Sequence, residues 1–344
     1  MQIGFVGLGA VVETAYLPAL QNAFGHSLRC LGFDIQAART LDGITRCPTL
    51  ADLLARPLDT LFITTASLQH LEVLEQALAS SIPRIVVEKP IVATLAQIEK
   101  LNALLAVPEA AARVLALDHC MASINIVLLG LARDFSDIVS IEGFLQEPSG
   151  FNAAGEPIAL NFATGEADTR TLRHPDGVIL DIGTHVLAMM RETVRYLGGD
   201  GDITLQVVTA RDRLGREIAK GDLTTAEGEA HLQGATGGVP VDIWLNKYAG
   251  PSGGHKGLRL YLRDGRVISH DRRGAEDVLT LTDGDKIQSW RFGGTIYERC
   301  LMEHILGEQS LFTRDPDEVS RTTQRRLEEV AILLTLQQQL RGPH

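Results

Sequence analysis

A lysine, an aspartate and a histidine stand in sequence contexts that suit acid–base chemistry. Lys89 lies in the run Glu88-Lys89-Pro90, directly after an apolar segment. Asp181 and His185 are four positions apart, so a helix that begins near Asp181 would carry both on one face. A carboxylate beside an imidazole can orient it and stabilise its protonated form, as transfer of a hydroxyl proton requires. Taken singly, these motifs are more typical of a solvated surface lysine and of an ion pair on a helix surface.

The elements that must position Lys89 are short apolar strands separated by helical segments. A strand with both faces buried has an almost wholly apolar interior, and strand–helix alternation is typical of a parallel, doubly wound sheet. A residue that follows such a strand lies at the sheet edge where ligands bind, and the Lys89–Pro90 bond is a candidate for the cis form. The predicted strands are Gln2–Gly7, Leu28–Asp34, Thr60–Thr65, Arg84–Glu88 and Arg113–Asp118.

The first predicted strand leads into a glycine-containing loop that suits a dinucleotide. Gly7 permits the tight turn, and Gly9 lets the backbone approach a pyrophosphate. Ala10 and Val11 then open a helical run, whose N-terminus supplies N–H donors and a partial positive charge. Val12 occupies the position of the third glycine of the pattern. We predict a Rossmann domain with cofactor contacts at Gly7, Gly9, Ala10 and Val11.

Asp34 ends the second predicted strand, 22 residues after Val12. A carboxylate at this distance accepts hydrogen bonds from the ribose hydroxyls of NAD and repels the 2′-phosphate of NADP. Arg39 lies nearby and could soften that preference. We therefore predict NAD as the cofactor with NADP possible; the alternative is an exposed aspartate without a ligand.

After Asp118 the chain changes to longer, alternating strands that predict a large open, mainly antiparallel sheet. The expected fold class is therefore α/β, a doubly wound parallel sheet followed by an α+β domain, over residues 1–119 and 120–344. Two Asp-Gly pairs, Asp264-Gly265 and Asp283-Gly284, predict hairpin turns. The predicted strands are Ile138–Gln146, Ile203–Ala210, Val241–Tyr248, Leu258–Leu262, Arg266–His270, Val278–Thr282 and Lys286–Trp290. The other predicted elements are a helix at Met121–Leu131, a substrate-covering loop at Pro148–Asp176 and a C-terminal helix at 316–340.

Composition narrows the class of protein. The 344 residues are 45% hydrophobic and 22% charged, which is ordinary for globular domains. A net charge of -11 argues against nucleic-acid or anionic-membrane partners. The four cysteines are far apart and form no metal-ligand spacing, so we predict free thiols and no metal site. The start of the sequence shows no secretion signal, and no apolar run is long enough to span a bilayer. A cytoplasmic protein is expected.

Together, the motifs resemble one known family. The Gly7–Val12 loop, Asp34, His70, Glu88-Lys89-Pro90 and the run from Gly177 through Asp181 and Gly183 to His185 occur in the order and spacing of the Gfo/Idh/MocA oxidoreductases. The resemblance covers nearly the whole chain. It implies NAD(P)-dependent hydride transfer at a secondary alcohol carbon of a sugar, polyol, inositol or sugar derivative.

The resemblance also implies a role for each member of the catalytic group. His185 would be the general base that takes the hydroxyl proton. Asp181 would bind a neighbouring hydroxyl group and orient His185. Lys89 would hydrogen-bond the reacting oxygen and stabilise its developing negative charge. These roles require that the three side chains reach a single substrate carbon.

Other residues are predicted to bind cofactor or substrate. Thr65, His70, Glu88 and Lys89 are assigned to the cofactor, although His70 could instead be a helix-start residue capped by Ser67. His119, in Asp118-His119-Cys120, is predicted to contact the substrate together with Arg173, Asp181 and His185. The alternatives are an interior histidine at the domain boundary and, for Arg173, a solvated loop residue.

Two other functions fit the same motifs. One is an enzyme with resident NAD, such as a glycosidase or an internal redox isomerase. The other is a regulator that senses a dinucleotide or sugar without catalysis, which degraded catalytic residues would favour. An open sheet exposes apolar strand faces, so we also expect a homodimer or homotetramer.

Overall fold

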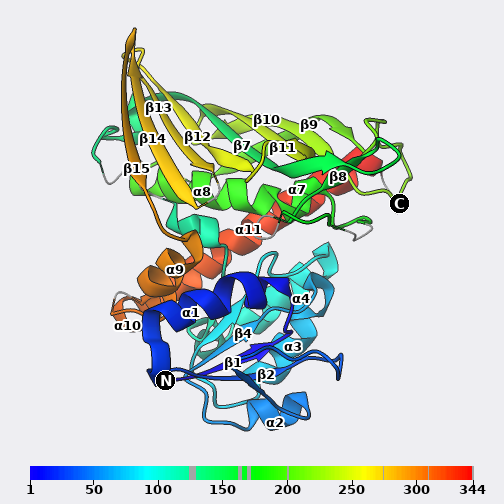
Figure 1. Cartoon of the computed structure of the whole chain (residues 1–344). Coiled ribbons are helices and arrows are strands. Elements are labelled where there is room, and N and C mark those ends of the chain that lie inside the picture. Colours follow the sequence, from blue (N-terminus) through cyan, green and yellow to red (C-terminus); the bar gives the residue numbers. More distant parts are fainter. Residues whose placement is uncertain are drawn as a thin grey trace. The chain divides into compact units, whose positions relative to one another are not determined.

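The computed structural model describes residues 1–123, 129–161, 165–168, 172–199, 201–273, 275–308 and 310–342. The chain forms two compact units (Figure 1). Unit 1 comprises Met1–His119 and Thr295–Ala331, and unit 2 comprises Cys120–Gly294 and Ile332–His344. The first crossing between the units coincides with the predicted boundary after residue 119. The segment Thr295–Ala331 differs from the prediction, because it joins unit 1.

The core of unit 1 is a six-stranded parallel sheet in the order β3-β2-β1-β4-β5-β6. This is the strand order of the Rossmann fold, so the predicted fold class is confirmed. Strands β1, β4, β5 and β6 are almost wholly buried, as their apolar sequences predicted, whereas β2 alternates buried residues with half-buried or exposed ones. The strands are β1 (Gln2–Val6), β2 (Arg29–Phe33), β3 (Ile44–Arg46), β4 (Thr60–Ile63), β5 (Ile85–Val87) and β6 (Val114–Ala116).

Helices flank this sheet (Figure 1). Thr49 caps α2 by a capping box with Asp52, and the Thr94 side chain caps α4 by accepting from the Gln97 amide. The helices are η1 (Val12–Tyr16), α1 (Leu17–Phe24), α2 (Leu50–Leu54), α3 (His70–Leu78), α4 (Leu95–Leu105) and α5 (Pro108–Ala111). From the later segment come α9 (Ile296–Cys300), η6 (Leu301–Ile305), α10 (Leu311–Arg314) and the first part of α11 (Pro316–Arg341).

Two contacts explain why the later segment belongs to unit 1. The Thr323 hydroxyl, on α11, donates to the Val114 carbonyl at 2.7 Å and accepts from the Ala116 amide at 3.0 Å, which covers the open edge of β6. Tyr297, on α9, packs edge-on against Tyr16, with their ring centroids 5.4 Å apart. Such pairings join residues hundreds of positions apart, so a local sequence pattern does not reveal them.

Unit 2 contains a nine-stranded sheet that is antiparallel except for the pair β7 and β11. Gly265 and Gly284 take positive φ angles in the turns after β12 and β14, which confirms both predicted hairpins. The short β8 and the whole of β10 were missed. The strands are β7 (Ile138–Phe151), β8 (Pro157–Ala159), β9 (Ile203–Arg211), β10 (Glu229–Thr236), β11 (Val239–Gly250), β12 (His255–Leu262), β13 (Val267–Arg273), β14 (Glu276–Asp283) and β15 (Lys286–Phe292).

One face of this sheet carries the helices α7 (Val178–Asp181) and α8 (Gly183–Tyr196) (Figure 1). The approach is close, because a Cβ atom on Gly143 of β7 would lie 2.5 Å from Val186 Cγ1 of α8. Val208 and Trp244, on β9 and β11, are exposed, while the alternating neighbours of Trp244 are buried. The homo-oligomer that would cover such a surface stays a prediction.

Two other predictions in unit 2 are altered. The predicted loop Pro148–Asp176 contains the end of β7 and its antiparallel partner β8, so part of it is a hairpin. Of the predicted helix Met121–Leu131, residues 121–122 form the end of a 3₁₀ turn, η4 (His119–Ala122), and 129–130 form a turn. Residues 124–128 lie outside the described part of the chain.

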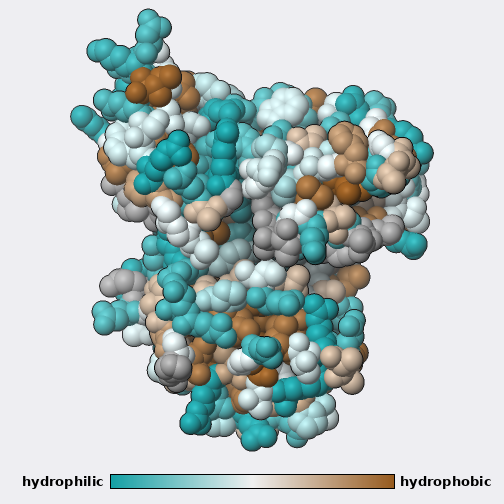
Figure 2. Space-filling view, in the orientation of Figure 1, coloured by the Kyte–Doolittle hydropathy of each residue, from teal (hydrophilic) through white to brown (hydrophobic). Residues whose placement is uncertain are grey.

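The surface hydropathy and the apolar character of the helices are the features that would indicate a membrane-spanning protein. On the face drawn in Figure 2, hydrophobic residues form separate patches among hydrophilic ones. Among the residues that the structure describes, no helix combines the length and apolar character needed to cross a bilayer.

Candidate active site

The loop after β1 makes the tight turn that its first glycine predicted. Gly7 has φ +93°, and a Cβ atom there would lie 2.8 Å from the backbone of Thr64. The loop is tied to the neighbouring strands, because the Gly7 amide donates to Phe33 O at 2.8 Å and the Thr64 hydroxyl donates to Gly7 O at 2.7 Å. Any side chain at position 7 would therefore displace the end of β4.

The next residues leave room for a ligand. A Cβ atom on Gly9 would meet no atom within 4 Å, so a pyrophosphate could approach this backbone. The chain is helical from Ala10 to Phe24, and η1 has no side-chain cap at its N-terminus. Val12, at the third glycine position, is fully buried and does not fill this space. The loop therefore fits a dinucleotide phosphate.

Asp34 lies at the end of β2, as predicted, and its carboxylate is held by the backbone. Oδ2 accepts from the Leu8 amide and Oδ1 from the Gln36 amide, both at 2.8 Å. Arg39 also follows β2, and its guanidinium donates to Leu8 O at 2.5 Å, so a positive charge lies beside the glycine loop. This arrangement fixes a carboxylate and a guanidinium beside the glycine loop, and the choice between NAD and NADP stays a prediction.

Glu88 and Lys89 follow β5, at the carboxyl edge of the parallel sheet. The buried Glu88 carboxylate accepts a short hydrogen bond from the Tyr16 hydroxyl and another from the Lys89 amide at 2.7 Å. The Lys89–Pro90 bond is cis. Burial raises the pKa of Glu88 to about 7, and burial together with the nearby Glu88 charge raises the pKa of Tyr16. Glu88 therefore holds the backbone from which the Lys89 side chain extends.

The raised pKa of Glu88 predicts a pH-dependent stability. A glutamate with a pKa of 4.5 in the unfolded chain ionises before Glu88 does in the folded protein, at about 7. The stabilisation that Glu88 gives by staying protonated in the folded protein is fully present below pH about 4.5. It is lost as the pH rises to about 7, which lowers the free energy of unfolding by up to about 3 kcal/mol. Relative to Glu88→Gln, the wild-type protein should lose stability over this interval in urea denaturation. An unchanged difference at pH about 5 and about 8 would contradict the assignment.

His70 connects two loops at the carboxyl edge of the same sheet. It begins α3, and its ring nitrogens lie 2.9 Å from the carbonyl oxygens of Thr65 and Pro90. Burial lowers its pKa. The predicted Ser67 cap is wrong, because α3 has no side-chain cap hydrogen bond. In this structure His70 holds the loop after Lys89, while the predicted cofactor contacts of His70 and Thr65 stay predictions.

Asp181 and His185 belong to consecutive helices. Asp181 is the last residue of α7, and His185 lies in the first turn of α8, which starts after a break at Ile182. Asp181 Oδ2 accepts a hydrogen bond from Lys247 Nζ at 3.0 Å. His185 is buried, and its amide donates to Ile182 O at 3.2 Å. Asp181 and His185 therefore lie on separate helices, and the expectation that a single helix carries both on one face is wrong, because Ile182 separates α7 from α8.

Lys247 was not predicted as a site residue, although the alternating pattern of its strand indicates an inward-facing position. On β11 the residues Val241, Ile243, Leu245 and Lys247 are all buried, at every second position. Lys247 therefore stands on the inward face of an alternating strand, where a charged residue needs a partner. Its second partner is Glu147 on β7, at 2.8 Å.

The glycine that opens the motif is required by packing. A Cβ atom on Gly177 would lie 1.7 Å from Glu227 Oε2, which accepts from Gln337 at 3.1 Å. Arg341 pairs with Glu227 and donates to Thr225 O at 2.7 Å. The end of α11 and Glu227 thus hold the start of α7 in unit 2.

The two other predicted substrate residues differ in burial. His119 is buried, and its ring stacks on Tyr297 in unit 1 with centroids 4.1 Å apart. Arg173 is exposed, and its backbone pairs with Thr225. These surroundings agree with the interior and solvated alternatives, and substrate contact stays a prediction for both.

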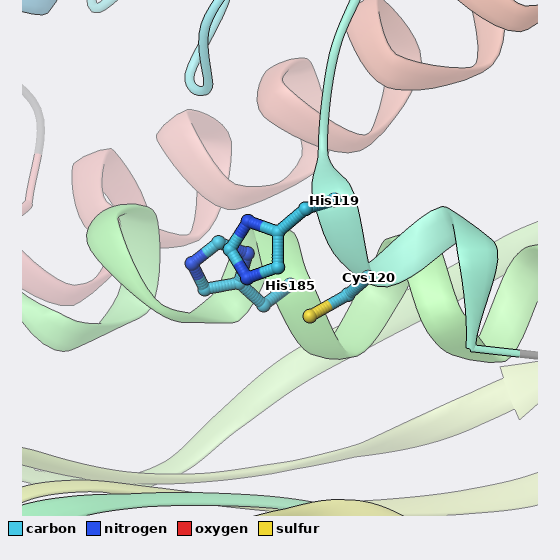
Figure 3. A group of neighbouring side chains, drawn as sticks. All are labelled: His119, Cys120 and His185. Carbon is cyan, nitrogen blue, oxygen red and sulfur yellow. The ribbon is translucent and has the colours of Figure 1, made fainter. Parts of the chain in front are cut away.

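Cys120 and His185 lie close together within unit 2. The Cys120 sulfur and a ring nitrogen of His185 are within 4.8 Å, and the thiol points toward the helix of His185 (Figure 3). Figure 3 also labels His119, which precedes Cys120 in the chain. Both Cys120 and His185 are buried. Because they are far apart in the sequence, ligand spacing could not reveal this pair.

The predicted catalytic residues are therefore divided between the two units. Lys89 belongs to unit 1, whereas in unit 2 the structure pairs Asp181 with Lys247 and places Cys120 beside His185. The requirement that Lys89 acts on the same carbon as Asp181 and His185 stays a prediction.

Comparison with protein families decides the class of unit 1. Residues 1–115 match the family described as an oxidoreductase family with an NAD-binding Rossmann fold, Gfo/Idh/MocA. Over these residues the chain is similar to the Gfo/Idh/MocA oxidoreductases. The resemblance inferred from the glycine loop and the Glu88-Lys89-Pro90 motif is thereby confirmed. No curated protein sequence matches the chain significantly.

Solved structures share the fold over nearly the whole chain. UDP-N-acetylglucosamine 3-dehydrogenase GnnA from Acidithiobacillus ferrooxidans has a TM-score of 0.66 and 17% identity, with 98% of this chain and 99% of that chain covered. The 3-ketoreductase KijD10 from Actinomadura kijaniata, in complex with NADP and TDP-benzene, has a TM-score of 0.66 and 16% identity over 97% of both chains. A dehydrogenase (MviM) from Clostridium difficile has a TM-score of 0.64 and 13% identity over 98% of both chains. At these identities, the likeness concerns the fold.

Proposed function

We propose that this protein is an NAD(P)-dependent dehydrogenase or reductase that acts on a secondary alcohol carbon of a sugar, polyol or sugar derivative. The observation that carries the proposal is the open backbone at Gly9, which a dinucleotide phosphate fits, at the switch point of a Rossmann sheet in which Lys89 follows β5, two strands away from β1. NAD(P), when bound, accepts or supplies the hydride. A likeness to enzymes of sugar nucleotides adds support for the substrate class.

Gly7, Gly9, Ala10 and Val11 would hold the pyrophosphate, and Asp34 the ribose. Asp34 follows β2, and the Leu8 amide of the glycine loop already orients its carboxylate. The fixed carboxylate favours NAD, while the Arg39 guanidinium, which donates to Leu8 O, leaves NADP possible.

The protein side chains would manage the proton and the charge of the substrate. His185 would take the hydroxyl proton on a ring nitrogen, and Asp181 would bind an adjacent hydroxyl group and stabilise the imidazolium. Lys89 would donate a hydrogen bond from Nζ to the reacting oxygen. In the reductive direction the same groups would return the proton to that oxygen. The burial of His185 would limit proton exchange with water.

A substrate screen tests the proposal. The purified protein is incubated with NAD or NADP and with sugars, sugar phosphates, inositols, amino sugars and UDP-N-acetylglucosamine, and absorbance is followed at about 340 nm. We expect substrate-dependent reduction of the nicotinamide, which the His185→Ala variant lacks.

The outcome also separates the alternatives. Product formation without a net change in absorbance would indicate resident-cofactor chemistry, as in a glycosidase or redox isomerase. Tight binding of NAD and a sugar without any product would contradict the proposal and indicate a regulator.

A further inference from the structure

Lys247 is a buried ammonium between two carboxylates in unit 2. Its side chain is 2% exposed, and Nζ lies 3.0 Å from Asp181 Oδ2 and 2.8 Å from Glu147 Oε2. Burial alone lowers the pKa of Lys247, but the charges of Asp181 and Glu147 outweigh this effect and raise it above its ordinary value. Lys247 is therefore charged at neutral pH.

The three residues come from three elements. Glu147 and Lys247 lie on the adjacent parallel strands β7 and β11, while Asp181 ends α7. The Asp181 side chain is 27% exposed, so its carboxylate reaches the surface above an ammonium that solvent does not reach. Lys247 therefore pairs with a carboxylate that solvent reaches, and a lysine that only neutralises a buried charge would not require such a partner.

We propose that Lys247 is a positioning residue that fixes the Asp181 carboxylate in its ionised form, in the geometry that Asp181 needs to bind a substrate hydroxyl. This inference rests on the proposed function. The ion pair anchors the end of α7 to the sheet, directly before the break at Ile182 and four residues before His185. Loss of the ammonium would leave Asp181 mobile and beside an uncompensated Glu147 charge.

The groups that act on this cluster come from several elements. Besides Asp181 and Glu147, the charge of Lys247 influences Tyr248, which is also within reach of Arg213 and Asp168. His185 follows Asp181 on the next helix. Any pH profile of the site must be interpreted with these groups.

Two substitutions predict opposite changes in the pH profile. Lys247→Met removes a cation from Asp181, so the acid limb of kcat/KM should move to higher pH by about one unit, and kcat/KM should fall by about 100-fold. Glu147→Gln keeps a hydrogen-bond acceptor for Lys247 and removes a like charge, so the acid limb should stay in place or move to lower pH. Lys247→Arg should restore about tenfold of the lost kcat/KM, because it keeps the cation. The Kd of NAD should remain unchanged in all three.

A stability measurement tests the contact without activity. The thermal midpoints of Asp181→Asn, Lys247→Met and the double variant should be non-additive, with the double variant melting higher than the sum of the two single shifts predicts. If Lys247→Met does not fold, the kinetic comparison uses Glu147→Gln and Lys247→Arg. Each of these two variants retains the charged contact to Asp181.

The results separate the inference from the function on which it rests. An active wild-type enzyme whose Lys247→Met variant keeps its pH profile, or whose Glu147→Gln variant shows the same upward shift, would overturn the positioning role alone. Additive thermal shifts would overturn the contact. A wild-type protein that binds NAD but converts no substrate would overturn the proposed function and, with it, the catalytic meaning of the Lys247 contact.

Discussion

Replacing His185 with alanine should lower kcat by about 100-fold or more while the Kd of NAD changes by less than about twofold. His185 is assigned the role of general base, and removal of a positioned base leaves proton transfer to water. The cofactor loop at Gly7 and Gly9 lies in unit 1, whereas His185 lies on α8 of unit 2. Substrate kinetics and fluorescence titration with NAD measure the two quantities separately.

His231→Ala is a matched control for this experiment. His231 is another histidine of unit 2, on β10, where its ring stacks on Trp244 with centroids 3.8 Å apart. We expect this variant to retain the kcat of the wild-type enzyme. Equal loss of kcat and of NAD affinity in His185→Ala would indicate that His185 has a structural role, and the general-base assignment would be wrong.

The fold of unit 1 could be predicted because its signals are local. Most strands of its sheet are apolar runs buried on both faces, and Gly7 marks the turn after β1. The strand β3 was missed because it has only three residues, Ile44–Arg46, two of them polar. In unit 2, the Asp-Gly pairs located two hairpins, whereas β10 contains polar residues and three small ones (Ala230, Gly234 and Ala235) that hide its alternation.

The contacts of the site depend on the tertiary fold. The sequence indicated that Asp181 and His185 belong to one motif, but the ion pair between Asp181 and Lys247 forms only because α7 lies against β11. Likewise, Cys120 meets His185 through packing, since no ligand spacing joins them. The residue types of a motif can suggest a reaction. The residue that pairs with the Asp181 carboxylate can be identified only from the arrangement of strands and helices.

Replacing Lys89 with methionine should lower kcat by about 100- to 1000-fold, because one hydrogen-bond donor to a developing oxyanion contributes about that much. Methionine keeps a long, unbranched side chain and removes the ammonium. The backbone should stay in place, since the Lys89 amide still donates to Glu88 and His70 still contacts Pro90. Because Lys89 is also assigned a cofactor contact, kcat should be measured at saturating substrate and saturating NAD(P).

Lys100→Met is the control for the loss of a positive charge from unit 1, since Lys100 is an exposed lysine on α4. It should leave kcat unchanged. The decisive comparison is the double variant Lys89→Met with His185→Ala. Residues that stabilise one transition state act as a unit, so the combined loss should be much smaller than the product of the two single losses. Multiplicative losses would mean that Lys89 and His185 influence turnover independently, and a common reacting oxygen would then be excluded.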